Sequence, residues 1–474
     1  MTVRALCCDW FSEPWELYQA LAVPPAVLLE SARTVSSTGR YSILAHRPFL
    51  DLRYEQGRLS LSRPGLTTKS FVTRNPFTAL QSAVRSYTFS PSPGLPPFSA
   101  GAIGYLSYEC KDSFLPRAGS RLRNDTRVPD MNFLFFDHSV VWDHRERCIF
   151  FCGEKPEDLE KECRQAVSRA AARHLPFFSE EGSGMDIRSS MQKDEYEEAV
   201  RRVQREISAG EIFQANLSHR FEFALPQGAR EAYSRLREVN PSSFFGLFEG
   251  GDFEIVSGSP ERLLRLLGRV LDTRPIAGTR KRGKNWKQDE ALGAELLLSE
   301  KERAEHVMLV DLERNDLGRV CEYGSVHVDE FMAVEDYSHV KHIVSNVRGL
   351  LREDLDALDA LAAFFPGGTI TGAPKIRCAQ IIDQIETVPR GPYTGSLGYL
   401  SFTGEMDFNI LIRSLVVKDG VATLHAGAGI VADSDPAKEY YETLHKAEAV
   451  LEAVFGAEKV RHFFRERGLA ARVS

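Results

Sequence analysis

A glycine-rich stretch at residues 366–375, Pro-Gly-Gly-Thr-Ile-Thr-Gly-Ala-Pro-Lys, constrains the fold of this chain more than any other segment. Apolar residues follow it at helical spacing, from Ile376 to Ile385. The pattern predicts a turn that opens onto a helix, with Pro374 in the first helical turn. Free backbone N–H groups and the positive end of the helix dipole attract anions, so we expect an anion-binding site at this turn.

The composition is that of a globular protein and argues against nucleic-acid-binding and membrane-spanning proteins. The chain has 474 residues, of which 43% are hydrophobic and 26% charged, with a formal net charge of −7. This length suits two or three domains or one large α/β body, and the acidic balance argues against nucleic acid as a partner. No apolar run is long enough to span a membrane, and no signal peptide is evident. The eight cysteines lack Cys-x-x-Cys spacing, which predicts reduced thiols and a cytoplasmic protein.

Four regions are expected along the chain. Strand-rich sequence at 1–175 precedes a linker-like segment at 176–190, a catalytic region at 191–456 and a tail at 457–474. Two eight-residue segments, 101–108 and 395–402, resemble each other. Their similarity indicates duplicated halves, equivalent strands of two packed sheets, or simply a shared β-strand composition.

Two predicted helices carry paired carboxylates. Glu302 and Glu305 are three residues apart in a helix expected at 294–309, and Glu439 and Glu442 have the same spacing at 436–455. Residues at i and i+3 share one face of a helix. Two such pairs suit a hard cation such as Mg²⁺, which prefers oxygen ligands.

Further turns and polar groups accompany these helices. Glycines and cations follow Pro275, and a second glycine-rich turn lies at 425–436. A predicted strand ends in Glu261, a candidate acid, and another ends at Arg413. Together these features indicate a Mg²⁺-dependent enzyme that acts on a small polyanion. Neither a Gly-x-x-x-x-Gly-Lys-Ser/Thr loop nor zinc-ligand spacing is present.

Taken in order, these motifs resemble those of the chorismate-utilising enzymes, which include the anthranilate, aminodeoxychorismate, isochorismate and salicylate synthases. The resemblance is dense over about 190–455. It implies an α/β (α+β) fold with two antiparallel sheets packed face to face, flanked by helices, and an active site in the cleft between them.

The resemblance also implies roles for individual residues. Glu305 and Glu442 match Mg²⁺ ligands, Glu302 and Glu439 match supporting carboxylates, and Glu261 matches the general acid that protonates the departing C4 hydroxyl of chorismate. Cleft positions and groups that bind the substrate carboxylates fall on Gly278, Thr279, His342, Thr371, Tyr393, Arg413, Gly427, Ala428, Gly429 and Lys446.

Gln214, in Phe-Gln-Ala-Asn-Leu-Ser, indicates whether water or ammonia is the nucleophile. Water-using relatives carry a lysine at this position, and a glutamine cannot act as that base. The chain therefore resembles the ammonia-using branch, in which a separate glutamine amidotransferase subunit supplies the ammonia.

Two products remain open within that branch. Gln-Ala-Asn-Leu and the 366–375 run resemble aminodeoxychorismate synthase component I, which makes 4-amino-4-deoxychorismate on the way to 4-aminobenzoate and folate. Ala277 instead resembles anthranilate synthase component I, which releases anthranilate and pyruvate for tryptophan synthesis, because some aminodeoxychorismate synthases have a lysine there. Glu30 and Ser31 lie in a segment that resembles a tryptophan-binding site. The first product is our prediction.

Overall fold

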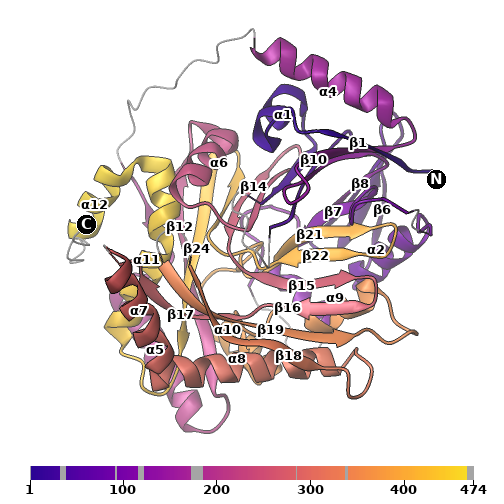
Figure 1. The fold of residues 1–474 in the computed structure, drawn as a ribbon. Helices are drawn as coiled ribbons and strands as arrows, with labels where there is room; N and C mark the ends of the chain where they lie inside the picture. Colours follow the sequence, from indigo (N-terminus) through magenta and orange to yellow (C-terminus); the bar gives the residue numbers. More distant parts are fainter. Residues whose placement is uncertain are drawn as a thin grey trace.

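Two antiparallel sheets form the centre of the molecule (Figure 1). The structure, a computed structural model, describes residues 2–31, 39–90, 93–115, 122–171, 185–283, 285–336 and 340–466. Parts of the predicted linker and tail, 176–184 and 467–474, lie outside the described residues.

The first sheet runs in the order β1 (Arg4–Asp9), β10 (Cys148–Gly153), β9 (Ser139–Asp143), β3 (Tyr41–His46), β2 (Ala26–Glu30), β13 (Phe244–Glu249), β14 (Glu254–Ser259), β23 (Ser414–Lys418), β24 (Val421–Ile430), β12 (Gln214–Ala224) and β11 (Arg188–Ser189), and β20 (Gly372–Ala373) pairs with β12. The second runs in the order β17 (Ile276–Lys281), β19 (Val340–Leu350), β16 (Val270–Thr273), β15 (Arg262–Leu267), β22 (Met406–Asn409), β21 (Ser396–Ser401), β7 (Gly101–Leu106), β8 (Met131–Phe136), β4 (Leu50–Glu55), β5 (Arg58–Ser62) and β6 (Lys69–Val72), and β18 (His327–Asp336) pairs with β19.

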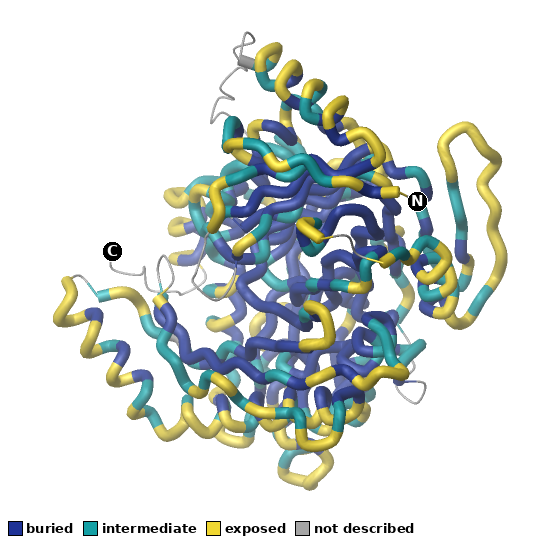
Figure 2. The backbone as a smooth tube through the Cα atoms, turned by 45° about the vertical axis from the view of Figure 1, so that its right-hand side comes forward, coloured by how far each residue is buried: buried dark blue, intermediate teal, exposed yellow. Residues whose placement is uncertain are grey.

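Helices cover the outer face of each sheet. The first sheet packs against α1 (Pro14–Leu21), α4 (Pro156–Ala171), α5 (Lys193–Ser208), α6 (Gly228–Val239), α10 (Lys375–Ile385), α11 (Pro436–Phe455) and α12 (Ala457–Glu466). The second packs against α2 (Pro76–Arg85), α8 (Glu300–Gly318) and α9 (Ala357–Phe364), while α7 (Trp286–Leu298) lies on β17 and β19 and the short η1 (Tyr108–Cys110) and α3 (Lys111–Phe114) follow β7. Figure 2 shows the resulting pattern: most residues of the central strands are buried, and the outer helices alternate buried and exposed residues.

Strand β8 shows why the sheets pack face to face. Its sequence Met-Asn-Phe-Leu-Phe-Phe is buried throughout. Alternate side chains point to opposite faces of a strand, so both faces of β8 must be covered. Phe133 and Phe135 belong to the core that the second sheet shares with its outer helices, whereas Leu134 and Phe136 belong to the core between the sheets, which also contains Val27 of β2. Apolar side chains on both faces thus require two cores, one on each side of the sheet. The predicted fold class is confirmed.

The N-terminal region and the catalytic region share both sheets. Strand β2 pairs with β13 in the first sheet, and β7 pairs with β21 in the second. The two similar segments at 101–108 and 395–402 are therefore neighbouring strands of one sheet, with Gly104 opposite Gly398. Of the three explanations left open by the sequence, equivalent strands of two packed sheets is therefore wrong.

Helix α11 has the bounds that we expected, whereas two other helices differ. Helix α11 begins directly after Asp435, whose carboxylate accepts hydrogen bonds from the N–H groups of Ala437 and Lys438, as a capping aspartate does. The helix expected at 294–309 is instead two helices that meet at Ser299, which caps α8. Helix α10 begins at Lys375, so Pro374 precedes the helix, and Ile376 is exposed and lies outside the buried stripe.

Candidate active site

The paired carboxylates of α8 and α11 face one another. Burial, followed by the charges of Glu302 and Glu442, raises the pKa of Glu305. Burial and the charge of Glu442 likewise raise the pKa of Glu439. Because the charge of Glu442 on α11 acts on Glu305 of α8, the structure places the two carboxylate pairs near each other.

Three of these four carboxylates already have a polar partner in the protein. Arg280 donates to Glu302 (3.1 Å), Ser434 donates to Glu439 (2.8 Å), and the Lys446 ammonium lies 2.9 Å from Glu442. Partial desolvation favours a higher pKa for Glu442, but the Lys446 ammonium outweighs it and leaves the pKa lowered. Carboxylate oxygens are the donors that Mg²⁺ prefers, so the donor chemistry fits that ion. Across the described residues, no three His, Cys, Asp or Glu side chains converge as a ready metal site, and Mg²⁺ stays a prediction.

Glu261 lies where the chain passes from β14 in the first sheet to β15 in the second. It is buried, its backbone carbonyl accepts the N–H of Ile410 (3.0 Å), and its carboxyl accepts the hydroxyl of Thr369 (3.1 Å). Burial raises the pKa of Glu261 to about 7, although Thr369 and the nearby cations pull in the opposite direction. A carboxylic acid that is half protonated near neutrality is suited to general acid catalysis.

Two cations lie around this acid. The charges of Lys446 and Arg413 both act on the Glu261 carboxyl, and the Lys446 ammonium donates to the Gly427 carbonyl (3.0 Å). Lys446 and its partner Glu442 are nearly half exposed, at 45% and 49%. An anionic ligand can therefore reach Lys446 from solvent, which fits its predicted role in binding a carboxylate.

Strands β12 and β24 bring Gln214 to the glycine turn. Ala428 pairs with Leu217 and Gly429 with Asn216. A Cβ atom at Gly429 would lie 2.6 Å from the Gln214 amide nitrogen, so a larger residue there would displace the Gln214 side chain. Gln214 is buried, and its amide oxygen lacks a hydrogen-bond partner within the described part of the chain. Such an atom is open to an N–H donor from a ligand.

The glycine-rich stretch at 366–375 is paired with the start of β12. Asn216 donates its N–H to the Thr371 carbonyl (3.1 Å), and Gln214 pairs with Ala373. The Thr371 hydroxyl donates to the Gly367 carbonyl (2.9 Å), so it stabilises the turn itself. Thr369, which sequence reasoning missed, is the hydroxyl of this stretch that contacts Glu261.

His342 lies on β19 opposite Thr279 of β17. Its Nδ1 lies 2.8 Å from the Gly278 carbonyl, and burial lowers the pKa of His342 to about 4. The imidazole is therefore neutral near pH 7. Gly278 has a φ of +63°, and a Cβ atom there would lie 2.9 Å from a carboxylate oxygen of Glu302. The side chain of Thr279 is outside the described residues.

A buried ion pair that sequence reasoning missed supports this region. Arg390 donates to Glu386 (2.6 Å), to the Asn216 carbonyl (2.6 Å) and to the Ile370 carbonyl (3.0 Å). Glu386 also accepts the N–H of Ser218 (2.8 Å). The pair thus ties the 366–375 stretch to β12. Helical i, i+4 spacing could not have revealed this pair, because α10 ends at Ile385 and Arg390 lies beyond the helix.

The predicted tryptophan-binding residues belong to a different part of the fold. Glu30 ends β2 and accepts hydrogen bonds from Arg237 (2.6 Å to each oxygen) and Tyr233 (2.7 Å). Ser31 donates to the Tyr41 carbonyl (3.0 Å). Protein groups therefore satisfy both side chains, and tryptophan binding stays a prediction.

Comparisons with known proteins identify the family of this chain. The chorismate binding enzyme family matches residues 25–452. The chain is 42% identical to aminodeoxychorismate synthase component 1 of Bacillus subtilis (strain 168), over 90% of this chain and 91% of that one. It is also 42% identical to anthranilate synthase component 1 of Thermus thermophilus (94% and 96% covered). The crystal structure of anthranilate synthase component I from Streptococcus pneumoniae TIGR4 superposes with a TM-score of 0.77 at 35% identity (93% and 97% covered). This chain therefore belongs to the chorismate binding enzyme family.

Proposed function

We propose that this enzyme converts chorismate and ammonia to 4-amino-4-deoxychorismate, on the route to 4-aminobenzoate and folate. The observation that carries the amination chemistry is the Glu261 site: a buried acid with a pKa of about 7, with Lys446 and Arg413 close enough to act on it. Chorismate carries two carboxylates, which these cations suit. Its C4 hydroxyl leaves only when protonated, and Glu261 supplies the proton.

Mg²⁺ is part of the proposal. Glu305 and Glu442 would hold the ion, with Glu302 and Glu439 behind them. When bound, the ion acts as a Lewis acid toward the substrate's ring carboxylate. The charge of the ion would also offset the negative charges of Glu302 and Glu442, which add to burial in raising the pKa of Glu305. Cytoplasmic localisation belongs to the proposal as well; across the described residues no helix has the length and apolar character needed to cross a bilayer.

Gln214 supports ammonia as the nucleophile. Its buried amide can orient an N–H donor through the open oxygen, but it cannot take a proton from water as a lysine amine can. We propose that a glutamine amidotransferase subunit supplies the ammonia.

A second product has a specific observation in its favour. Ala277 is buried on β17 opposite Ile343, so no amine is available there for attack on C2 of chorismate. The name of the Thermus relative also points to anthranilate. The amino-acid sequence of residues 366–375 and the name of the Bacillus subtilis relative (strain 168) support 4-amino-4-deoxychorismate as the product.

One assay separates the two products. The enzyme is incubated with chorismate, MgCl₂ and an ammonium salt, and anthranilate is followed by its fluorescence. We expect little anthranilate, and 4-aminobenzoate only after addition of a lyase that removes pyruvate. Rapid formation of anthranilate without the lyase would reject the proposed product in favour of the second.

A further inference from the structure

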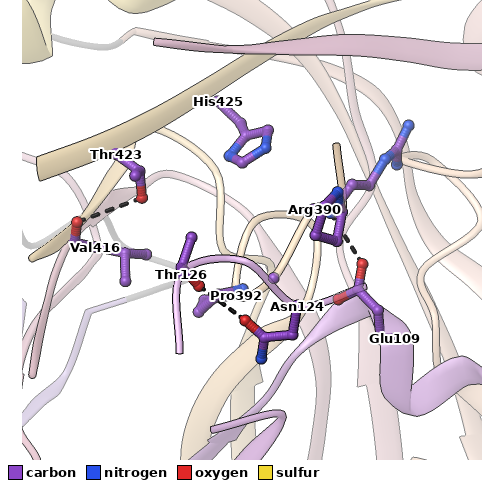
Figure 3. A pocket seen from close by; sticks show the side chains of 10 residues that line it. Glu109, Asn124, Thr126, Arg390, Pro392, Val416, Thr423 and His425 are labelled. Carbon is purple, nitrogen blue, oxygen red and sulfur yellow. Dashed lines mark hydrogen bonds between the residues drawn. The ribbon is translucent and has the colours of Figure 1, made fainter. Parts of the chain in front are cut away.

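Figure 3 shows a small cavity in the fold. Glu109, Asn124, Thr126, Arg390 and His425 are among its lining residues. The space open to the centre of a water-sized molecule is about 10 Å³, which is room for about one such molecule. The cavity can therefore hold a single small ligand.

Two buried polar atoms in this lining lack a partner within the described residues. One is Oε2 of Glu109, whose other oxygen accepts the Arg390 N–H (2.9 Å), and the second is Nε2 of His425. Burial lowers the pKa of His425, so the ring is neutral, and its other nitrogen hydrogen-bonds the Pro389 carbonyl. Nε2 is then an acceptor. When Glu109 is ionised, the cavity has two open acceptors, which suit a ligand that donates hydrogen bonds.

The Glu109 side of the cavity is the one that favours a cation over water, because at His425 the charges of Arg220 and Arg390 add to burial in disfavouring positive charge. Among the described residues no ion pair reaches the Glu109 carboxyl, since the nearest cations are already engaged. Arg390 pairs with Glu386 (2.6 Å), and Lys111 pairs with Asp112 (2.9 Å). Burial raises the pKa of Glu109 to about 8. The free carboxyl is therefore mostly protonated near pH 7, and a cation in contact with it would favour its ionised form, which a neutral molecule would do much less.

The cavity is next to the reaction site. The His425 ring stacks on Tyr393 with ring centroids 5.2 Å apart and planes 11° from parallel. The Lys446 ammonium in turn lowers the pKa of Tyr393, although burial leaves that pKa raised. One aromatic ring therefore separates the cavity from the cation that we assign to the substrate carboxylate.

We infer that this cavity binds one ammonium ion, the nitrogen source of the amination, between the carboxyl of Glu109 and the imidazole of His425. The inference rests on the proposed function, because only an amination needs ammonia. Ammonium is close to water in size, and its N–H groups fit the two open acceptors. Held here, the nitrogen source would accumulate one ring away from chorismate.

The first test is kinetic and varies ammonium at saturating chorismate and MgCl₂. Glu109→Gln keeps the shape of the side chain and removes its charge. We expect the KM for ammonium to rise about tenfold or more, since a charge-assisted hydrogen bond is lost, with the KM for chorismate unchanged. Glu405→Gln, on the hairpin between β21 and β22, is the matched control and should leave both constants at wild-type values. An unchanged KM for ammonium in Glu109→Gln would overturn the inference.

The second test needs no variant. Crystals of the wild-type enzyme are soaked in thallium(I), an electron-rich ion of about the size of ammonium, with and without excess ammonium. An anomalous peak between Glu109 and His425 that ammonium displaces is the expected result. Density for a water molecule there, unaffected by either ion, would overturn the inference. If the wild-type enzyme consumes no ammonia at all, the proposed function fails, while the soak still decides whether the cavity binds the cation.

Discussion

Replacing Glu261 by glutamine is expected to change activity and stability in opposite directions. Glutamine keeps the shape of the side chain and still accepts the hydroxyl of Thr369, which lies 3.1 Å from the carboxyl. It cannot supply a proton to the leaving hydroxyl. General acid catalysis contributes about 10²–10⁴ to the rate, so turnover should fall by that factor, or about 3–5 kcal/mol in activation free energy.

The effect on stability follows from the raised pKa of Glu261. The folded value of about 7 lies above the ordinary 4.5, so the folded state holds its proton more tightly than the unfolded state. The stability from this proton is fully present below about pH 4.5 and is lost as the pH rises through about 7. The difference corresponds to at most about 3 kcal/mol. The glutamine variant avoids that loss and should be more stable than wild type at pH 8, by up to this amount.

Two measurements test this reasoning. Urea unfolding at pH 5 and pH 8 gives the free energies of unfolding, and a pH profile of kcat/KM reports the essential acid of the free enzyme. Wild-type activity should fall above about pH 7, where Glu261 loses its proton. Thr369→Val is a matched control: because the Thr369 hydrogen bond lowers the pKa of Glu261, its removal should move that fall to higher pH.

The reasoning would be refuted by two outcomes. A glutamine variant that retains turnover within about threefold of wild type would show that Glu261 is not the acid. A variant that is less stable than wild type at pH 8, with its loss of activity matching its unfolded fraction, would show a structural role only.

Three other changes probe the rest of the site. Glu442→Gln should abolish Mg²⁺-dependent turnover with little change in stability, since the side chain is 49% exposed; unchanged Mg²⁺ titrations would contradict its placement. Arg390→Met should lower the free energy of unfolding by about 3–5 kcal/mol, because it leaves the buried carboxylate of Glu386 uncompensated; urea unfolding with unchanged stability would refute this. Gly429→Ala would place a Cβ 2.6 Å from the Gln214 amide, and a displaced amide should reduce ammonia-dependent turnover by up to about 10²-fold; circular dichroism controls for folding, and wild-type turnover would argue against a role for Gln214.

Elements with local signals were predicted well. Helix α11 has an aspartate cap, a proline in its first turn and carboxylates at i, i+3, and its bounds match those expected. The carboxylates on α8 were found in the same way, although the break at Ser299 was missed. That serine caps the second helix by accepting the N–H of Glu302, a bond that the apolar periodicity across it does not reveal.

Contacts between distant segments were predicted poorly. Thr371 was expected at the substrate and Thr369 was not considered, yet Thr369 is the one that reaches Glu261, 108 residues away in sequence. Ile376 continues the helical period but is exposed. Neither outcome follows from spacing, because each depends on which neighbour the folded chain places beside the residue.

The sequence by itself determined the residue types of the site: the carboxylates on two helices, the acid after a strand, and the glycine-rich turns. These depend on caps, periodicity and side-chain chemistry, which act within a few residues. Only the tertiary structure decided which groups share an environment. Burial, and charges contributed by other strands and helices, set the pKa of Glu261 to about 7 and leave Glu109 without an ion-pair partner among the described residues. Desolvation and Coulomb interactions depend on distance in space, and that distance is fixed only when the two sheets and their helices pack together.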